Sequence, residues 1–126
     1  FTTIQTQIRD LDALNDACTE MKLELLSDTP VRGYGGVTRK AFRTIKLKGR
    51  YDIAVDPSEE NDGSYGLTTD WWEGGVAFEV GAGYGRLLQT YGVHKTLREA
   101  RQRGLRATRK VEPNGSILLT LEGGSL

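Results

Sequence analysis

The sequence contains very little cysteine, histidine or proline, and it has no long apolar run. Its 126 residues include one Cys, one His and three Pro. The single cysteine, Cys18, excludes an internal disulfide and any all-cysteine metal or iron–sulfur site within one chain. Zinc would need carboxylates from distant segments, because only His94 and Cys18 are available as its usual ligands, so we expect neither a metal nor another cofactor. No apolar stretch approaches the roughly 20 residues that span a bilayer.

The overall composition is that of a soluble globular protein, with 37% apolar and 27% charged residues. A chain of this length corresponds to one domain, so we expect a single domain over residues 1–126. The first residue is Phe rather than Met. We therefore expect a short leader to be missing, and nothing that remains resembles a signal peptide. A reducing, cytoplasmic setting is compatible with the single cysteine.

Two alternating segments around a reversal are the clearest structural pattern. Residues 51–56 and 65–71 each alternate apolar with polar or small side chains, which is typical of half-buried strands. Pro57 cannot donate a ladder hydrogen bond, and Asp62-Gly63 suits a backbone at positive φ. These segments therefore predict an antiparallel hairpin in the middle of a sheet.

Two further segments have helical spacing of apolar residues. Asp10 occupies an N-cap position before a first helix whose apolar stripe continues to Leu25. A second helix is expected over about residues 83–103 and is ended by Gly104. Its apolar stripe is offset near Gly92, so we expect a bend or a change of facing there. Cys18 lies on the first stripe, which favours a buried small hydrophobe over a reactive thiol.

The remaining pattern completes an α+β fold. Strands are expected at residues 1–8, 41–47, 105–111 and 117–121, and the first is expected near a sheet edge. We interpret the glycine-rich segment 74–85 as a loop with a short strand at Val76–Val80. The order β-α-β-β-β-α-β-β predicts a mainly antiparallel sheet with two helices packed on one face, ferredoxin-like or related.

Several short motifs resemble one family in the same order along the chain. They are Phe1-Thr-Thr-Ile-Gln-Thr-Gln-Ile, Val31-Arg-Gly-Tyr-Gly-Gly, Gly49-Arg-Tyr-Asp-Ile, Thr69-Asp-Trp-Trp and Leu87-Leu-Gln-Thr-Tyr-Gly-Val-His. Together they resemble the hypothetical chloroplast reading frame thirty-five family of red-lineage plastids, cyanobacteria and some of their phages. That family has unknown function and no assigned catalytic residues, so the resemblance implies no site. The segment 74–85 departs from the family pattern because it is longer and richer in glycine.

The resemblance also implies a cellular setting. Genes of this family are sometimes found beside those for an AAA-type ATPase and a ferredoxin. The resemblance therefore implies an accessory role in a photosynthetic cell, in the cyanobacterial cytosol or the plastid stroma. An AAA-type ATPase or a ferredoxin-linked system is then a candidate partner.

Three groups of residues have side chains or backbone groups that could carry chemistry. Gly81, Gly83 and Gly85 precede a helix, where small residues let backbone N–H groups approach an anion, but their spacing matches neither a dinucleotide fingerprint nor a P-loop. A flexible loop is therefore favoured over anion binding. His94 is interpreted as a helix-surface or partly buried imidazole. The polar side of the predicted hairpin carries three carboxylates, Asp52, Asp56 and Asp70.

These carboxylates have two interpretations. They would have to approach one another to act as a pair in acid chemistry or to bind a cation. A solvated strand face paired with Lys46 or Lys48 is favoured, because opposite charges across strands stabilise a sheet. No catalytic constellation is recognised, so we expect a protein that is not an enzyme.

Charge is segregated along the chain although the net charge is zero. Arg32–Arg50 contains seven basic residues and no acid, Arg86–Lys110 contains eight with Glu99 the only acid, and residues 52–79 carry eight acids and no base. If the basic segments meet in space, they form a patch suited to phosphate or an acidic partner. Internal neutralisation is favoured for most of these charges. The residues of the conditional patch are Arg39, Arg43, Arg98, Arg101, Arg106 and Arg109.

Adjacent tryptophans suggest an interaction surface. If the strand continues through Trp71 and Trp72, the two side chains point to opposite faces, so that one lies in the core and the other is exposed. The alternative is that the glycine-rich segment covers the second tryptophan. An exposed Trp is a common interface anchor. We therefore expect a non-enzymatic accessory or adaptor protein that binds a protein partner through Trp72 and the basic side of the second helix.

Two alternative functions remain. The first is RNA or DNA binding through the two basic segments, with Arg39, Arg43, Arg101 and Arg106 as the contacts. The second is binding of a small anionic ligand at Gly81–Gly85.

Overall fold

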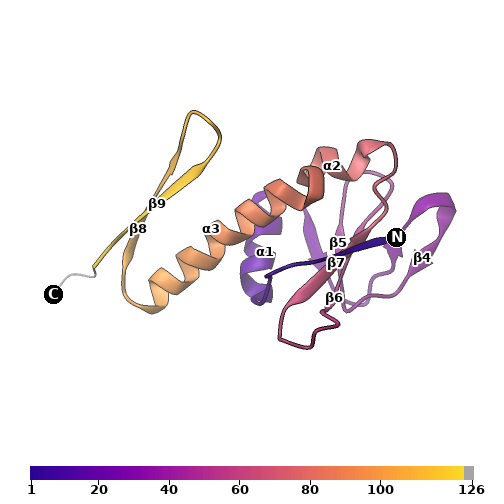
Figure 1. The fold of residues 1–126 in the computed structure, drawn as a ribbon, viewed down its shortest axis with the longest axis horizontal. Coiled ribbons are helices and arrows are strands. Elements are labelled where there is room, and N and C mark those ends of the chain that lie inside the picture. Colours follow the sequence, from indigo (N-terminus) through magenta and orange to yellow (C-terminus); the bar gives the residue numbers. More distant parts are fainter. Residues whose placement is uncertain (124–126) are drawn as a thin grey trace.

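A five-stranded antiparallel sheet forms the body of the protein in the computed structural model, which describes residues 1–123 (Figure 1). The strand order is β1-β7-β6-β5-β2. The predicted α+β class, with its mainly antiparallel sheet, is confirmed. In chain order the elements are β1 (Thr2–Gln5), α1 (Leu11–Glu20), β2 (Glu24–Leu26), β3 (Val31–Arg32), β4 (Thr38–Arg39), β5 (Arg43–Lys46), β6 (Ile53–Pro57), β7 (Tyr65–Thr69), α2 (Gly75–Val80), α3 (Gly85–Gln102), β8 (Arg106–Val111) and β9 (Ile117–Glu122).

The β6–β7 hairpin lies at the centre of this sheet, as the alternating pattern predicts. The two strands pair antiparallel with Val55 opposite Leu67, and both side chains are fully buried. Gly63 has φ +86° in the connecting turn, a left-handed conformation that glycine adopts without steric cost. The expected position of β1 at a sheet edge is also confirmed.

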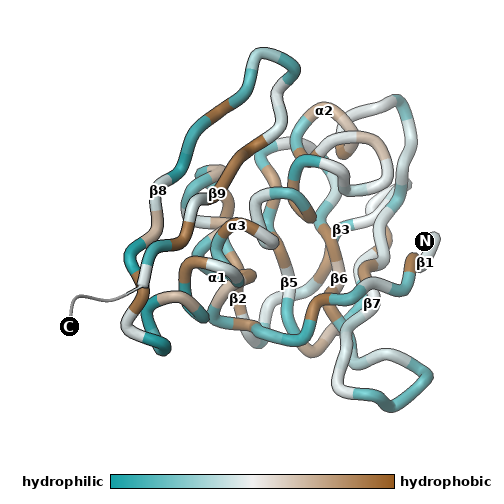
Figure 2. The backbone as a smooth tube through the Cα atoms, turned by 60° about the vertical axis from the view of Figure 1, so that its left-hand side comes forward, coloured by the Kyte–Doolittle hydropathy of each residue, from teal (hydrophilic) through white to brown (hydrophobic). Residues whose placement is uncertain are grey.

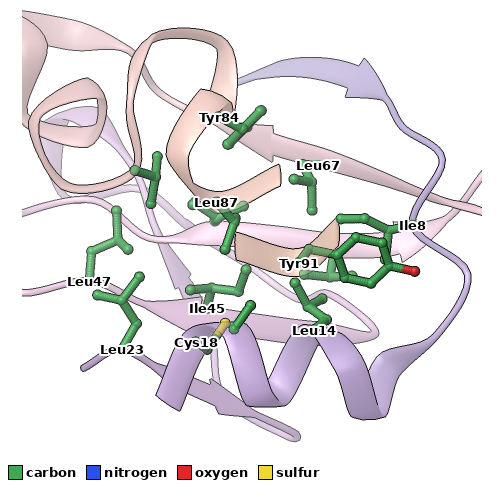
Figure 3. Close-up of a cluster of buried hydrophobic side chains, with 14 of the residues drawn as sticks. Ile8, Leu14, Cys18, Leu23, Ile45, Leu47, Leu67, Tyr84, Leu87 and Tyr91 are labelled. Atoms are coloured by element: carbon green, nitrogen blue, oxygen red, sulfur yellow. The ribbon is translucent and has the colours of Figure 1, made fainter. Parts of the chain in front are cut away.

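The main core lies between the sheet and the helices, which cover one of its faces (Figure 3). Leu14 and Cys18 from α1 meet Leu87 and Tyr91 from α3 above the sheet residues, among which is Ile45. The predicted burial of Cys18 is confirmed, and burial raises the pKa of its thiol to about 12. Its reactive thiolate is therefore scarce at neutral pH.

The first helix is shorter than predicted. The carboxylate of Asp10 caps it by accepting from the backbone N–H of Ala13 at 3.1 Å, but the helix ends at Glu20 rather than near Leu25. Lys22 adopts φ +61°, which turns the chain, and Leu25 then pairs with Ile45 as part of β2. The helical spacing of Leu25 was therefore coincidental, because an edge strand also turns this side chain toward the core.

The predicted strand at Val76–Val80 is wrong, because this segment is the helix α2. Val76 and Val80 are buried, whereas Phe78 between them is 83% exposed. A strand would place all three side chains on one face, while a helix brings only the residues four apart together. Gly74 enters this helix at φ +72°, so the glycines shape turns around a helix rather than a long loop.

The last two strands form a separate hairpin instead of joining the main sheet. Figure 2 shows the β8–β9 hairpin as an outer layer beside α1 and α3, on the side away from β6 and β7. Leu87 and Tyr91 of α3 face the main core, whereas Val93 and Ala100 are buried outside that core cluster, and the helix also contacts the hairpin. The offset stripe therefore marks the predicted change of facing in a helix that continues through Gly92.

The ends of α3 and its length complete the fold. Gly104 follows the helix at φ +69°, and the backbone N–H of Leu105 donates to the carbonyl of Ala100 at 2.8 Å, which confirms the predicted helix end. Across residues 1–123, no helix combines the length and apolar character that crossing a bilayer requires.

Candidate functional site

Three aromatic side chains meet at the surface beside the main sheet. The ring centroid of Tyr34 lies 5.4 Å from that of Trp72 and 6.5 Å from that of Tyr51. Tyr34 is 56% exposed and Trp72 is 55% exposed, and Tyr51 is half-buried. We call Tyr34, Tyr51 and Trp72 the aromatic surface. Large rings are usually well buried, so two rings exposed to this extent and in contact form a candidate binding surface.

A tight turn places Trp72 outside and Trp71 inside. Strand β7 ends at Thr69, and a 3₁₀ turn at Trp72–Gly74 follows. Trp71 packs against the core with its ring centroid 4.7 Å from that of Tyr84, while Trp72 faces solvent. The prediction of one core and one exposed tryptophan is correct. The turn produces this outcome, whereas the prediction had assumed a strand that continues through both residues.

Tyr34 occupies a turn of the same kind. It begins the 3₁₀ turn Tyr34–Gly36 between β3 and β4, and Gly35 and Gly36 have φ of +72° and +79°. After Trp72, Glu73 and Gly74 have φ of +58° and +72°. Each exposed ring therefore precedes two left-handed residues, which reverse the chain and leave the ring at the tip of a turn.

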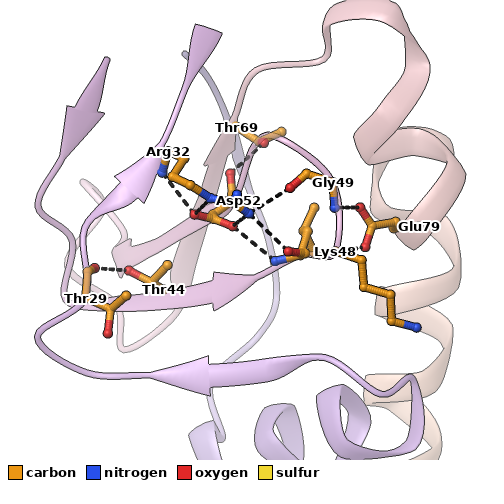
Figure 4. Close-up of polar contacts among 9 residues, drawn as sticks. Thr29, Arg32, Thr44, Lys48, Gly49, Asp52, Thr69 and Glu79 are labelled. Atoms are coloured by element: carbon orange, nitrogen blue, oxygen red, sulfur yellow. Dashed lines mark hydrogen bonds and ion pairs between the residues drawn. The ribbon is translucent and has the colours of Figure 1, made fainter. Parts of the chain in front are cut away.

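Asp52 fixes the segment that carries Tyr34 (Figure 4). Its carboxylate is 1% exposed and accepts from the backbone N–H of Arg32 at 3.0 Å, from Nε and a terminal nitrogen of the same residue at 2.9 and 2.8 Å, and from the N–H of Leu47 at 3.1 Å. Burial opposes ionisation of Asp52, but these hydrogen bonds outweigh it and lower its pKa. The N–H of Asp52 also donates to the carbonyl of Arg32, so β3 is tied to the start of β6.

The favoured interpretation of the three carboxylates as a solvated face paired with lysines is wrong. Both faces of β6 are covered, one by the helices and the other by β3, whose Val31 is fully buried. Asp56 accepts from Arg39 at 3.1 Å, and Asp70 accepts from the backbone N–H of Tyr34 at 2.6 Å. Asp52, Asp56 and Asp70 therefore have separate partners, and two of them hold the Tyr34 turn in place.

A groove runs beside the aromatic surface. Its volume is 560 Å³, and it is lined by the turn from Gly33 to Thr38 together with Arg32, Arg50 and Tyr51. Burial first, and then the charge of Glu73, raise the pKa of Tyr51, while Arg50 acts in the opposite direction. The charges of Glu73 and Arg50 therefore both act on the hydroxyl of Tyr51, in opposite directions.

The basic residues predicted to form one patch lie in two separate places. Figure 1 places β4, which carries Arg39, and β8, which carries Arg106 and Arg109, at opposite ends of the molecule. Arg39 pairs with Asp56, and Arg43 lies over the Phe42 ring with its guanidinium carbon 4.3 Å from the ring centroid.

Ion pairs also engage the basic residues near α3. Arg98 binds Asp16 at 2.5 and 3.1 Å, and Arg109 binds Glu20 at 2.7 and 2.8 Å. His94 is partly buried, as predicted, and its Nε2 lies 2.8 Å from the same Glu20 carboxylate. Asp16, Glu20, His94 and Arg98 border a depression of 430 Å³ that is open to solvent. The hydrogen bond from Arg109 first, and that from His94, lower the pKa of Glu20 to about 2 against the opposing effect of burial.

A comparison with protein families gives one match. The family described as a protein of unknown function (DUF1257) matches residues 17–120. The chain belongs to the DUF1257 family. Comparisons with curated proteins and with solved structures found no match. The region shared with DUF1257 includes the whole aromatic surface, and the family description states no activity.

The glycines before α3 in this DUF1257 protein have structural roles. Gly81 has φ +86°, and a Cβ added there would lie 2.8 Å from the backbone nitrogen of Arg86, so only glycine fits. Gly83 has φ +59°, and Gly85 begins α3. Anion binding at these glycines stays a prediction. Among residues 1–123, no group of three or more His, Cys, Asp or Glu residues is placed to hold a metal.

Sequence reasoning identified Trp72 but missed Tyr34 and Tyr51. Their contact depends on two turns that are far apart in the DUF1257 chain. The shared pattern of an aromatic residue followed closely by two glycines, Tyr34-Gly-Gly and Trp72-Glu-Gly-Gly, was the available signal. Both patterns produce the same exposed position.

Proposed function

We propose that this DUF1257 protein is a non-enzymatic accessory or adaptor protein that binds a protein partner through the aromatic surface. The observation that supports the proposal is the contact between Tyr34 and Trp72, each more than half exposed. Tryptophan and tyrosine are the residues on which interface energy concentrates, because they contribute a large apolar area at little entropic cost.

The scaffold beneath these rings supports the same proposal. Asp70 binds the N–H of Tyr34, and Asp52 fixes the preceding Arg32, so the Tyr34 turn is held before any partner arrives. A preorganised surface loses less conformational entropy on binding than a mobile one. A tyrosine that is exposed without a binding role would not require two carboxylates to fix its turn.

The alternative of RNA or DNA binding has weaker support. Carboxylates neutralise Arg39, Arg98 and Arg109, which reduces the charge available to phosphates. Arg101 and Arg106, near the end of α3, are exposed. In the proposed function they make a second contact, with acidic residues of the protein partner. Filter binding to RNA and DNA that weakens steeply with salt would favour the alternative.

The resemblance to the chloroplast reading frame thirty-five family extends the proposal to a setting. The protein then acts in the cytosol of a cyanobacterium or in the plastid stroma, or it serves a phage of such cells. An AAA-type ATPase or a ferredoxin-linked system is the candidate partner. Binding assays with purified forms of both test this extension separately from the surface itself.

A capture experiment with matched variants tests the proposed function. Wild type, Trp72→Ala and Phe78→Ala serve as baits in a lysate of the source cells, and each captured protein is purified and titrated against the three baits. Phe78 is the control, because it is 83% exposed but does not belong to the aromatic surface. We expect one partner to bind wild type and Phe78→Ala equally and Trp72→Ala at least about 30-fold more weakly. Equal binding to all three baits would contradict the proposal.

A further inference from the structure

The three rings are tilted against one another rather than stacked. The Tyr34 ring makes an angle of 64° with Trp72 and of 53° with Tyr51. Tilted neighbours present a ridged surface instead of a flat platform, and the groove lined by Tyr34 and Tyr51 runs beside it. A compact, rigid, apolar group such as a proline ring fits such a cleft, whereas a flat base stacks best on an open ring face.

Each polar group of the aromatic surface can donate a hydrogen bond to a peptide carbonyl. Trp72 brings an indole N–H and the tyrosines bring hydroxyl groups. Gly35 and Gly36 line the adjoining groove, and the space beside their Cα atoms is empty, which leaves room for a ligand backbone. A polyproline II peptide has no internal hydrogen bonds, so its carbonyls are available to such donors.

Other peptide conformations match the surface less well. A helix uses most of its carbonyls internally and binds through a long apolar stripe, for which the groove offers Val37 as its one aliphatic lining residue. Strand addition needs a long edge, but β3 and β4 contain two residues each. An extended ligand with rigid rings and open carbonyls remains the best match.

The charges beside the rings favour a peptide over nucleic acid. Glu73 directly follows Trp72 and has no ion-pair partner in the part of the chain that the structure describes, and Asp70 lies two residues before Trp72. Of the two arginines that line the groove, Arg32 is bound by Asp52, whereas Arg50 is in none of the ion pairs among residues 1–123. Beside Trp72 itself, a phosphate would meet the carboxylate of Glu73, whereas a basic peptide residue would pair with it.

We infer that the aromatic surface binds a proline-rich peptide in the polyproline II conformation, with a basic residue of the peptide beside Glu73. The inference rests on the proposed function and names its ligand class. The prolines pack in the groove beside Tyr34 and Tyr51, and Trp72 and the tyrosine hydroxyls donate to the peptide carbonyls. A free proline-rich peptide already populates few conformations, so it loses little conformational entropy when it binds.

A random-peptide phage library tests this inference without knowledge of the natural partner. The library is selected on wild type, Trp72→Ala and Phe78→Ala. We expect proline-rich sequences with a flanking Lys or Arg to be enriched on wild type and Phe78→Ala and lost on Trp72→Ala. Trp72-dependent peptides without proline would overturn the ligand class and leave the proposed function intact. The absence of any Trp72-dependent peptide would overturn the ligand class, while the capture experiment judges the proposed function separately.

Titration of one selected peptide then tests the placement of its charge. Replacing its prolines by alanine should weaken binding at least tenfold, and Glu73→Gln should weaken binding by up to about fivefold only when the basic residue is present. Trp72→Ala is checked by circular dichroism to be folded, as its exposed position leads us to expect. Oligouridylate serves as competitor, and binding of this RNA in preference to the peptide would overturn the inference.

Discussion

Replacing Asp52 by asparagine tests the network that holds the Tyr34 turn. The carboxylate has four donors, three from Arg32 and one from Leu47, and is almost fully buried. Asparagine keeps one oxygen of similar shape but replaces the other with an NH₂ group, which cannot accept a hydrogen bond. Each oxygen accepts from one guanidinium nitrogen and one backbone N–H, so two hydrogen bonds are lost whichever oxygen is replaced.

The expected loss of stability follows from these contacts. A hydrogen bond to a charged group contributes about 1.5–3 kcal/mol, so the loss of two would cost about 3–6 kcal/mol. Solvent reaches the Arg32 side chain, which is 38% exposed, and this places the expected loss near the lower limit, at about 3 kcal/mol. For a domain of this size the melting temperature should fall by about 12 °C.

The effect should depend on pH in one direction. The pKa of Asp52 is lower in the folded protein than in the unfolded chain. Its contribution is therefore complete above the unfolded pKa, at about 4, and is lost as the pH falls through the folded pKa. Asp52→Asn lacks this contribution at every pH, so its difference from wild type should narrow below about pH 4.

Urea unfolding followed by far-ultraviolet circular dichroism measures both effects. Asp56→Asn is the matched control, because Asp56 lies on β6, which directly follows Asp52, but is 32% exposed and pairs with a similarly accessible Arg39. We expect this control to lose less than about 1 kcal/mol. Equal losses for the two variants at neutral pH, or a difference from wild type that persists in acid, would refute the reasoning about Asp52.

Three other substitutions test separate parts of the fold. Glu20→Gln should increase amide exchange in β8–β9 and leave the central sheet unchanged, because Glu20 binds Arg109 of β8. The pKa of Glu20 is lowered to about 2, so the wild-type hairpin should lose the same protection as the pH falls from about 4 toward 2. Unchanged amide exchange in β8–β9 would contradict this role of Glu20. Glu73 has φ +58°, a backbone conformation that is strained for a residue with a side chain, so Glu73→Gly should raise the free energy of unfolding in urea titrations by about 1 kcal/mol. A loss of stability would show that contacts of the Glu73 side chain outweigh this backbone strain. Tyr84→Phe should leave the melting temperature unchanged or raise it, because the buried hydroxyl has no hydrogen-bond partner among residues 1–123, and a clear drop would reveal a partner.

Local patterns predicted the elements that are long and regular. The β6–β7 hairpin, α1 and α3 each combine apolar periodicity with a recognisable cap or turn. Strands β2, β3 and β4 are only two or three residues long, too short to show a period. In α2, the four-residue spacing of Val76 and Val80 was available, but the glycines on either side favoured a loop.

The site was predictable only in part, because its contacts join distant segments. Exposure of Trp72 followed from its position beside Trp71, whereas its contact with Tyr34 requires knowledge of how two turns meet. Likewise, Arg98 and Asp16 are 82 residues apart, so the sequence showed segregated charge but not which charges pair. The favoured expectation of internal neutralisation holds for Arg39, Arg98 and Arg109.

Nuclear magnetic resonance of the two indole N–H groups tests most directly whether the aromatic surface binds the partner. Titration with the partner captured by wild type should shift or broaden the signal of Trp72 and the amide signals of Gly35 and Gly36. The signal of Trp71, which lies against the core, should stay in place. An unchanged Trp72 signal, with perturbations confined to Arg101 and Arg106, would contradict binding at the aromatic surface.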